Sequence, residues 1–235
     1  MANVLVEETS LQNIANSIRE KTGTEDTYKP SEMATAISNI ESGGGSGSNA
    51  YDGIIDRTIT EITNNSVASI GKYAFSKCTN LTNVTFTETT IVDEEAFEGC
   101  TGLITINFPK ATHFRYSSFK GCKALTNINA PELTYLNVNV FYGCTSLTSV
   151  DLPKVNSIGN GCFQSCTSLT KVILRANEVC YISRGAGASI FNNTPIKNGT
   201  GYVYVPDDLV ESYKADTNWS EIADQIKPIS ELQTE

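Results

Sequence analysis

Cysteine is the residue type whose spacing first suggests chemistry, because thiolates bind metals, form disulfides and act as nucleophiles. The chain has seven cysteines, and five of them recur with a period of 22: Cys78, Cys100, Cys122, Cys144 and Cys166. This interval does not match zinc-ligand spacing, and repeated side chains that point the same way suit disulfide geometry poorly. We therefore predict a buried column of free thiols, since unpaired cysteine is among the most buried residue types. Pairing of Cys162 with Cys180, outside the column, stays open.

Acid–base catalysis would have to rely on few residues. The only histidine, His113, lies in "KATHFRYSSF", and its equivalents in the neighbouring repeats are Ile91 and Tyr135, so we predict a variable surface turn there. The acidic stretch "DEEAFE" at 93–98 follows the same interval and is interpreted as a solvated turn. There is no phosphate-binding loop and no Cys/His pair at zinc spacing. The sequence predicts no catalytic residue, no metal site and no cofactor.

The period of the cysteines organises most of the chain. Phenylalanine recurs in step with cysteine, at Phe75, Phe97, Phe119, Phe141 and Phe163. A leucine follows each of these cysteines at one fixed offset, and aliphatic residues follow at Val84, Ile106, Ile128, Val150 and Val172. A unit this short cannot enclose a core, so it must stack on copies of itself. In "LTSVDL" (147–152) apolar and polar residues alternate, which predicts one short strand per coil, paired in parallel with its equivalents about 4.8 Å away.

The pattern "LxxVxLPxVxxIGxxxFxxCxxL" resembles the leucine-rich repeats of the BspA-like class, and the resemblance covers residues 54–205. It implies a leucine-rich-repeat solenoid of parallel strands with short return segments, in about seven coils. "ITEITN" (59–64) fits as a degenerate first unit. After Phe163 the period would place a phenylalanine at position 185, but the next one is Phe191. "VCYISRGAGASIF" is therefore interpreted as containing a six-residue insertion before a closing strand, "YVYVP" at 202–206.

The two ends differ in composition from the repeats. Residues 1–42 contain two amphipathic segments that predict a small helical hairpin, and residues 43–50 form a Gly/Ser linker. Residues 206–235 predict a helical cap in which Asp207 or Asp208 caps a helix, and Trp219 and Ile222 cover the last coil of the 51–205 repeat domain. Residues 13–37 and the cap resemble parts of predicted phage structural proteins of Gram-positive bacteria, which implies a role in a virion.

The outward side of the predicted sheet is the candidate binding site. Short polar side chains dominate it, and two tyrosines close the row, which favours a shallow surface for a glycan or a polar protein epitope. Such residues also suit any solvated sheet. The candidate ligand-binding residues are Asn83, Thr85, Thr105, Asn107, Asn127, Asn129, Ser149, Asp151, Lys171, Tyr202 and Tyr204. Glu61, Thr63 and Ile173 share this side of the sheet.

Charge limits the partners. The net charge is −9, but residues 51–205 carry 12 positive and 11 negative side chains, so the acidity belongs to the ends. The sequence has no basic stripe that would predict nucleic-acid binding and no apolar run that would predict membrane insertion. The first residues lack a signal-peptide pattern, so we expect synthesis in the cytoplasm.

The function predicted is non-enzymatic recognition or adhesion. The resemblances imply a phage tail-associated, receptor-binding protein in the virion, with its repeat face turned to a host-surface glycan or protein and residues 1–42 bound to virion structural proteins, as a homotrimer by fibre analogy. An intracellular scaffold or host-directed effector with a protein partner is the alternative. A polysaccharide hydrolase is disfavoured, since the outward acids Glu61 and Asp151 would be about 19 Å apart.

Overall fold

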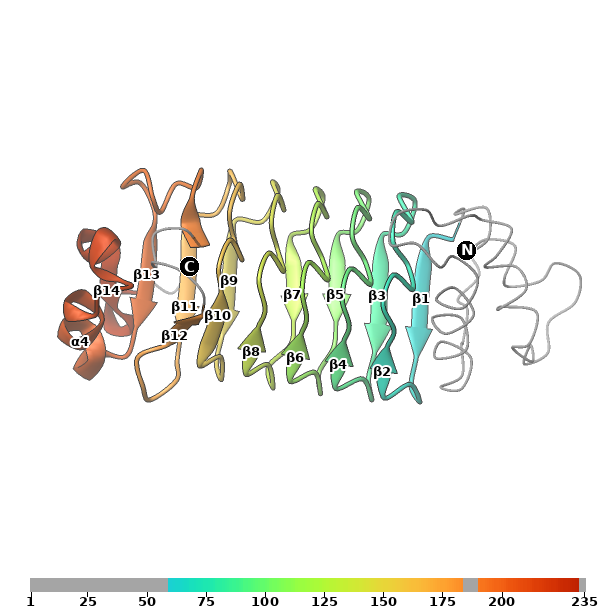
Figure 1. Ribbon diagram of the computed structural model, residues 1–235, viewed down its shortest axis with the longest axis horizontal. Coiled ribbons are helices and arrows are strands. Elements are labelled where there is room, and N and C mark those ends of the chain that lie inside the picture. The colour runs from blue at the N-terminus through green and yellow to red at the C-terminus, as the bar shows by residue number, and fades with distance from the viewer. Residues whose placement is uncertain (1–58, 184–189, 233–235) are drawn as a thin grey trace, which may run out of the picture.

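The structure, a computed structural model, describes residues 59–183 and 190–232, which form a solenoid of stacked coils (Figure 1). Each of the first six coils contributes two short strands, and the seventh contributes one. The front strands, which include those predicted at 59–64, 147–152 and 202–206, are β1 (Glu61–Asn64), β3 (Asn83–Phe86), β5 (Thr105–Asn107), β7 (Asn127–Asn129), β9 (Ser149–Leu152), β11 (Lys171–Leu174) and β13 (Tyr202–Val205). The back strands are β2 (Ser69–Ile70), β4 (Ile91–Val92), β6 (His113–Phe114), β8 (Tyr135–Leu136), β10 (Ser157–Gly159) and β12 (Tyr181–Ser183).

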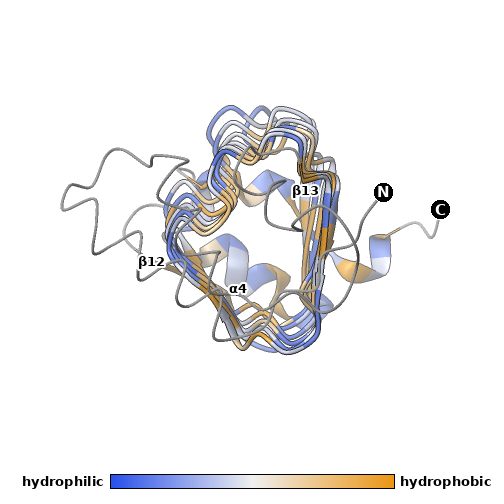
Figure 2. Cartoon of the chain, turned by 90° about the vertical axis from the view of Figure 1, so that its right-hand side faces the viewer, coloured by the Kyte–Doolittle hydropathy of each residue, from blue (hydrophilic) through white to orange (hydrophobic). Residues whose placement is uncertain are grey.

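Equivalent strands pair in parallel, as the repeat predicts. In β1 and β3, Glu61 lies opposite Asn83, its equivalent one period later in the sequence, and the same step relates β3 to β5 and β9 to β11. Looking along the axis, Figure 2 shows the coils superposed, with the front strands along one straight side. The repeat therefore builds a parallel-strand solenoid with few helices, as the sequence indicated.

The prediction of one strand per coil is wrong, because a second, six-stranded sheet runs along the back, in the order β12-β10-β8-β6-β4-β2. Most of its strands are a single pair of residues, too short for alternation to be visible in a sequence. His113 lies in one of them, β6, and not in the predicted turn, although its side chain is exposed as expected.

The front strands are divided into two sheets. One has the order β1-β3-β5-β7 and the other contains β9, β11 and β13, so within the described residues β7 and β9 are not paired. We call this gap the seam. The back sheet continues past it through β6, β8 and β10. At the seam, Ala130 stands where the neighbouring coils have Phe108 and Leu152, so the inner packing changes there from aromatic to aliphatic.

A continuous phenylalanine column fills the return side of the coils. All six rings are fully buried, and successive rings stack with centroids 5.1 to 5.9 Å apart and interplanar angles of 15° or less. Offset stacking of this kind adds about 0.5–1.5 kcal/mol per pair beyond the burial itself. The column consists of Phe75, Phe97, Phe119, Phe141, Phe163 and Phe191.

The cysteine column lies beside the phenylalanines, and all seven cysteines are free and buried, which confirms the predicted thiol ladder and leaves Cys162 and Cys180 unpaired. Each repeat thiol from Cys100 onward donates a hydrogen bond to the carbonyl of a phenylalanine in the preceding coil; that from Cys100 to Phe75 O is 3.0 Å long. A small apolar side chain with one weak donor fits this position.

Burial should make these thiols unreactive in the folded protein. Desolvation raises the pKa of Cys166 and Cys180 to about 12 and that of Cys122 and Cys144 well above the usual range, so the nucleophilic thiolate is suppressed. We expect a disulfide reagent at pH 8 to titrate none of the seven cysteines in the native protein and all seven in guanidinium chloride. A thiol that reacts rapidly without denaturant would contradict this packing.

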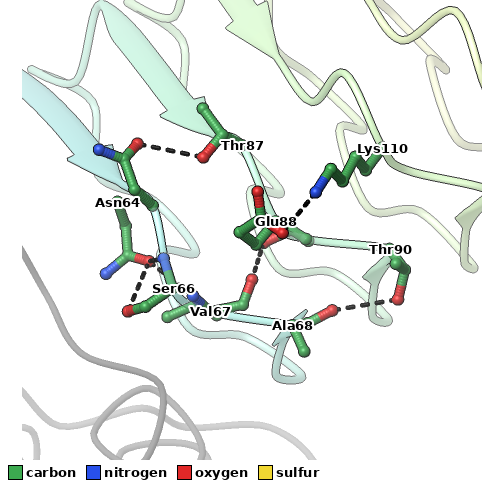
Figure 3. A network of polar contacts seen from close by, with 10 residues as sticks. Asn64, Ser66, Val67, Ala68, Thr87, Glu88, Thr90 and Lys110 are labelled. Carbon is green, nitrogen blue, oxygen red and sulfur yellow. Dashed lines mark hydrogen bonds and ion pairs between the residues drawn. The ribbon is translucent and has the colours of Figure 1, made fainter.

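Polar side chains stabilise the corners of the coils through hydrogen bonds and an ion pair, as Figure 3 shows for the first turns. Asn64 Oδ1 accepts hydrogen bonds from the backbone N–H groups of Ser66 and Val67, at 2.9 and 2.7 Å. Thr90 Oγ1 donates to the carbonyl of Ala68 in the preceding coil, and Lys110 forms an ion pair with Glu88. The threonine-rich composition of the repeats thus serves coil-to-coil hydrogen bonding.

The C-terminal cap is partly helical and partly a strand. It comprises η2 (Asp207–Leu209), α4 (Val210–Ala215), η3 (Ser220–Gln225), β14 (Ile226–Pro228) and η4 (Ile229–Glu231), and β14 extends the second front sheet beyond β13. Trp219 and Ile222 are buried, which confirms their predicted role. The predicted aspartate cap is wrong: no side chain caps η2 or α4, and Asp207 Oδ1 instead accepts a hydrogen bond from Ser230 N at 3.0 Å.

Three predicted segments lie outside the described residues: the helical hairpin at 1–42, the linker at 43–50 and most of the predicted insertion, at 184–189. Part of that insertion precedes β12, because Ser157 of β10 pairs with Tyr181, whereas the period alone would pair it with Val179. Among the described residues, none of the helices is long and apolar enough to span a membrane.

Candidate functional site

The predicted binding residues all lie on the outward side of the front strands, which we call the front face. Along each strand an outward side chain alternates with a buried one, as in β9, where Val150 and Leu152 are buried and Ser149 and Asp151 are exposed. Register brings the residues into rows across the coils. One row runs Asn83, Thr105 and Asn127, the next runs Thr85, Asn107 and Asn129, and beyond the seam Ser149, Lys171 and Tyr202 align.

The half of the front face before the seam is a polar ladder, and Glu61 on β1 is the one charged residue among the outward positions of its described strands. Asn83 Nδ2 donates to Glu61 Oε1 at 3.0 Å, and Asn129 Nδ2 donates to Asn107 Oδ1 at 2.6 Å. Asn127 is exposed, and its side chain makes no hydrogen bond within the described chain. One amide–carboxylate pair and one amide pair hold part of this surface in place, while Asn127, on the last strand before the seam, remains available to a partner.

The half beyond the seam carries charges and rings that are already engaged. Arg175 donates to both oxygens of Asp151, with Nε to Oδ1 at 2.9 Å and Nη2 to Oδ2 at 2.8 Å. The hydrogen bond with Asp151 raises the pKa of Arg175 further above its usual value. Both side chains are exposed, so this pair contributes little to stability, but it neutralises Asp151 as a ligand group.

The tyrosines at the end of the row have a cation above them. Lys227, on β14, places Nζ 4.3 Å from the ring centroid of Tyr202, and the rings of Tyr202 and Tyr204 meet edge-on at 6.3 Å. Lys227 Nζ also pairs with Glu231, whose hydrogen bond raises the pKa of the lysine. The predicted aromatic end of the face is therefore partly occupied by the cap.

Sequence reasoning missed Arg175 and Lys227. Arg175 occupies the position that follows each strand, where earlier coils have Pro109, Pro131 and Pro153. A prediction that included a third outward position in each coil would have identified Arg175. Lys227 lies in a strand outside the repeat pattern, so no repeat signal could have identified it.

The geometry offers little support for hydrolysis. The outward carboxylates Glu61 and Asp151 lie on β1 and β9, on opposite sides of the seam, and each already accepts hydrogen bonds. Glycoside hydrolysis uses two carboxyl groups about 5–9.5 Å apart, whereas strands four coils apart are separated by about 19 Å. Among residues 59–183 and 190–232, no cluster of three His, Cys, Asp or Glu side chains is placed to hold a metal.

Known leucine-rich repeat proteins are similar to parts of this chain. The family described as BspA type leucine rich repeat region matches in six copies over residues 46–170 and 90–202. A leucine-rich repeat protein of T. pallidum is 23% identical, with a TM-score of 0.47 over 65% of this chain and 80% of that one. A leucine-rich repeat protein from Bacteroides ovatus is 22% identical, with a TM-score of 0.45 over 74% of this chain and 52% of that one. No curated protein sequence matches the chain.

Proposed function

We propose that this chain, which belongs to the BspA-type leucine-rich repeat family, is a non-enzymatic recognition protein that binds a surface ligand through its front face. The observation that carries the proposal is the polar ladder before the seam, where Asn127 on β7 is exposed and its side chain makes no hydrogen bond with the described residues. Repeat solenoids use extended surfaces of this kind for binding.

The shape and chemistry of the front face favour a large polar partner. Small ligands are usually held in concave, mostly apolar pockets, whereas the outward row here is a sheet of short side chains such as Thr85, Asn107 and Asn129. A polar protein epitope or a glycan on a host surface can lie across several coils at once and use amide donors and acceptors.

Attachment to a virion is part of the proposal. Its support is the resemblance of residues 13–37 and of the cap to phage structural proteins. Residues 1–42 would bind virion structural proteins or copies of themselves, with a trimer as the expected copy number, and the linker would let the repeat domain move. Linked copies turn weak contacts into strong overall binding, because later binding events become intramolecular.

Substitution of Asn127 by arginine is expected to weaken binding to host cells at least about tenfold, the equivalent of about 1.4 kcal/mol. The change places a charge and a long side chain on β7, the last strand of the polar ladder before the seam, without removing any described side-chain contact. Binding of the purified protein to intact host cells measures the effect. Asn198→Arg, at an exposed position of the last coil outside the front strands, is the matched control and should bind as the natural chain does. Equal binding by Asn127→Arg would show that the front face is not the binding surface.

Mass spectrometry of purified phage particles tests the location. Detection in particles, together with oligomers of the full chain and monomers of residues 51–235 in light scattering, would support display on a virion. Absence from particles and a monomeric full chain would favour the alternative, an intracellular scaffold or effector that uses the same surface on a protein partner.

A further inference from the structure

The back sheet carries a second surface that differs in chemistry from the front face. Outward positions of its strands align in one row, from Ser69 through Ile91 and His113 to Tyr135, Ser157 and Tyr181. The turns that follow β2, β4 and β6 carry charged residues, and Lys72 forms an ion pair with Glu94. The turns after β8 and β10 begin instead with Asn137 and Asn160, and the largest side chains of β8, β10 and β12 are tyrosines.

The short side chain of Ser157, on β10, lies between two tyrosines of the neighbouring strands, and we call this stretch the trough. Ser157 lies in register with Tyr135 on one side and Tyr181 on the other, so the two tyrosine backbones are about 9.6 Å apart, twice the strand spacing. Two residues along β10, Gly159 is buried, and a Cβ there would lie 2.4 Å from the backbone of Asn137 and Val138, so the backbone of β10 packs directly against the preceding coil at this end.

The walls of the trough are aromatic and partly fixed. Tyr181 is 63% exposed, a large exposed fraction for an aromatic side chain. The ring of Tyr135 contacts the ring of His113 at 5.7 Å, on the side away from the trough. This contact limits the rotation of one wall, which reduces the entropy lost when a ligand stacks against it.

Neutral hydrogen-bonding groups surround the rings. Asn137 Oδ1 accepts from Val138 N at 2.7 Å, which orients the amide, and its Nδ2 has no partner within the described chain. The side chains of Asn156, exposed, and Ser157, half-buried, likewise make no hydrogen bond with described residues. The site thus offers amide and hydroxyl groups without a charge.

From this geometry we infer that the trough along β10 is a binding site for a neutral oligosaccharide, separate from the front face. A pyranose ring combines an apolar C–H face, which can stack on tyrosine, with hydroxyl groups that pair with amides and hydroxyls. An extended peptide fits less well, because peptides add to free strand edges, whereas β10 is paired on both sides, with β8 and β12.

The test uses the full-length protein and four separate probes: maltotetraose, cellotetraose, chitotetraose and mannotetraose. We expect at least one to bind in an NMR titration. Tyr181→Ala, which removes an exposed ring, should lower the affinity for it about tenfold, and Ser157→Tyr, which fills the trough while keeping both walls, should do the same. Tyr116→Ala, which removes a 40% exposed ring in another coil, is the matched control and should leave the affinity unchanged. Tyr204→Ala reports on the front face.

The inference would be wrong if no tetrasaccharide bound or if both trough variants bound the sugar as tightly as the natural chain does. It would also be wrong if an uncharged peptide bound more tightly at the trough and displaced the sugar. None of them affects the Asn127 result, because that experiment reads the opposite side of the coils. Loss of sugar binding in Tyr204→Ala alone would assign the sugar to the front face and likewise reject the trough.

Discussion

Replacement of Phe119 by alanine is expected to destabilise the protein by about 3–5 kcal/mol, the usual cost of truncating a buried phenylalanine. Phe119 is fully buried and contacts four rings: it stacks on Phe97 and Phe141 at 5.2 and 5.8 Å and meets Phe108 and Phe114 edge-on. The rings around Phe119 are themselves packed in the core, so the cavity that alanine leaves can close only in part. Urea unfolding followed by circular dichroism measures the loss.

Tyr116→Ala is the control for Phe119→Ala. It removes a nearby aromatic ring that is 40% exposed, so its effect should stay within about 0.5 kcal/mol. If the two variants were equally stable, the column would not be the main source of cohesion between the coils. Because neighbouring coils carry much of the stability of a repeat protein, a broadened transition in Phe119→Ala would also agree with local loss of the middle coils.

Removal of residues 206–235 should convert the protein into an aggregating species. The cap buries Trp219 against Phe191 and Tyr213, with ring centroids 6.3 and 5.2 Å apart, and Trp219 Nε1 donates to Cys180 O at 2.8 Å. Without the cap, β13 also loses its partner β14 and becomes an open sheet edge. We expect large oligomers in size-exclusion chromatography with light scattering.

The milder variant Trp219→Phe separates packing from hydrogen bonding in the cap. It keeps an aromatic ring over the last coil but removes the donor to Cys180 O, which should cost about 1–3 kcal/mol and leave the protein soluble. A soluble, monomeric chain that ends at Val205 would show that the last coil needs no cover.

The parts of the fold that could be predicted are those that repeat. Phenylalanine, cysteine and leucine at one interval specify which side chains share an interior column, because equivalent positions in stacked coils must coincide. The back strands escaped detection, since "SI" or "HF" has no visible period. The aspartate cap was wrong because the tail turns into a 3-10 helix and Asp207 binds Ser230, a contact between distant positions of the tail that no local pattern indicates.

The candidate site was predictable in position but not in availability. Alternation placed Asp151 and Tyr202 on the outward side, where the structure also has them. Their partners lie at positions that the prediction did not include: Arg175 follows the strand of the next coil, and Lys227 belongs to the cap. Whether an outward residue already has a partner depends on side chains from other coils. The period of the repeat does not indicate which of these side chains are long enough to contact it.

The seam between β7 and β9 has a mechanical consequence. When a solenoid is pulled along its axis, load passes from coil to coil, and at the seam it passes through the back sheet, the phenylalanine column and return-side backbone hydrogen bonds without help from the front strands. We expect this junction to be the first to yield. Each coil that then unravels releases one period of chain, about 70 Å when fully extended. Under load the solenoid would thus lengthen first at its middle, before strain separates the coils at either end.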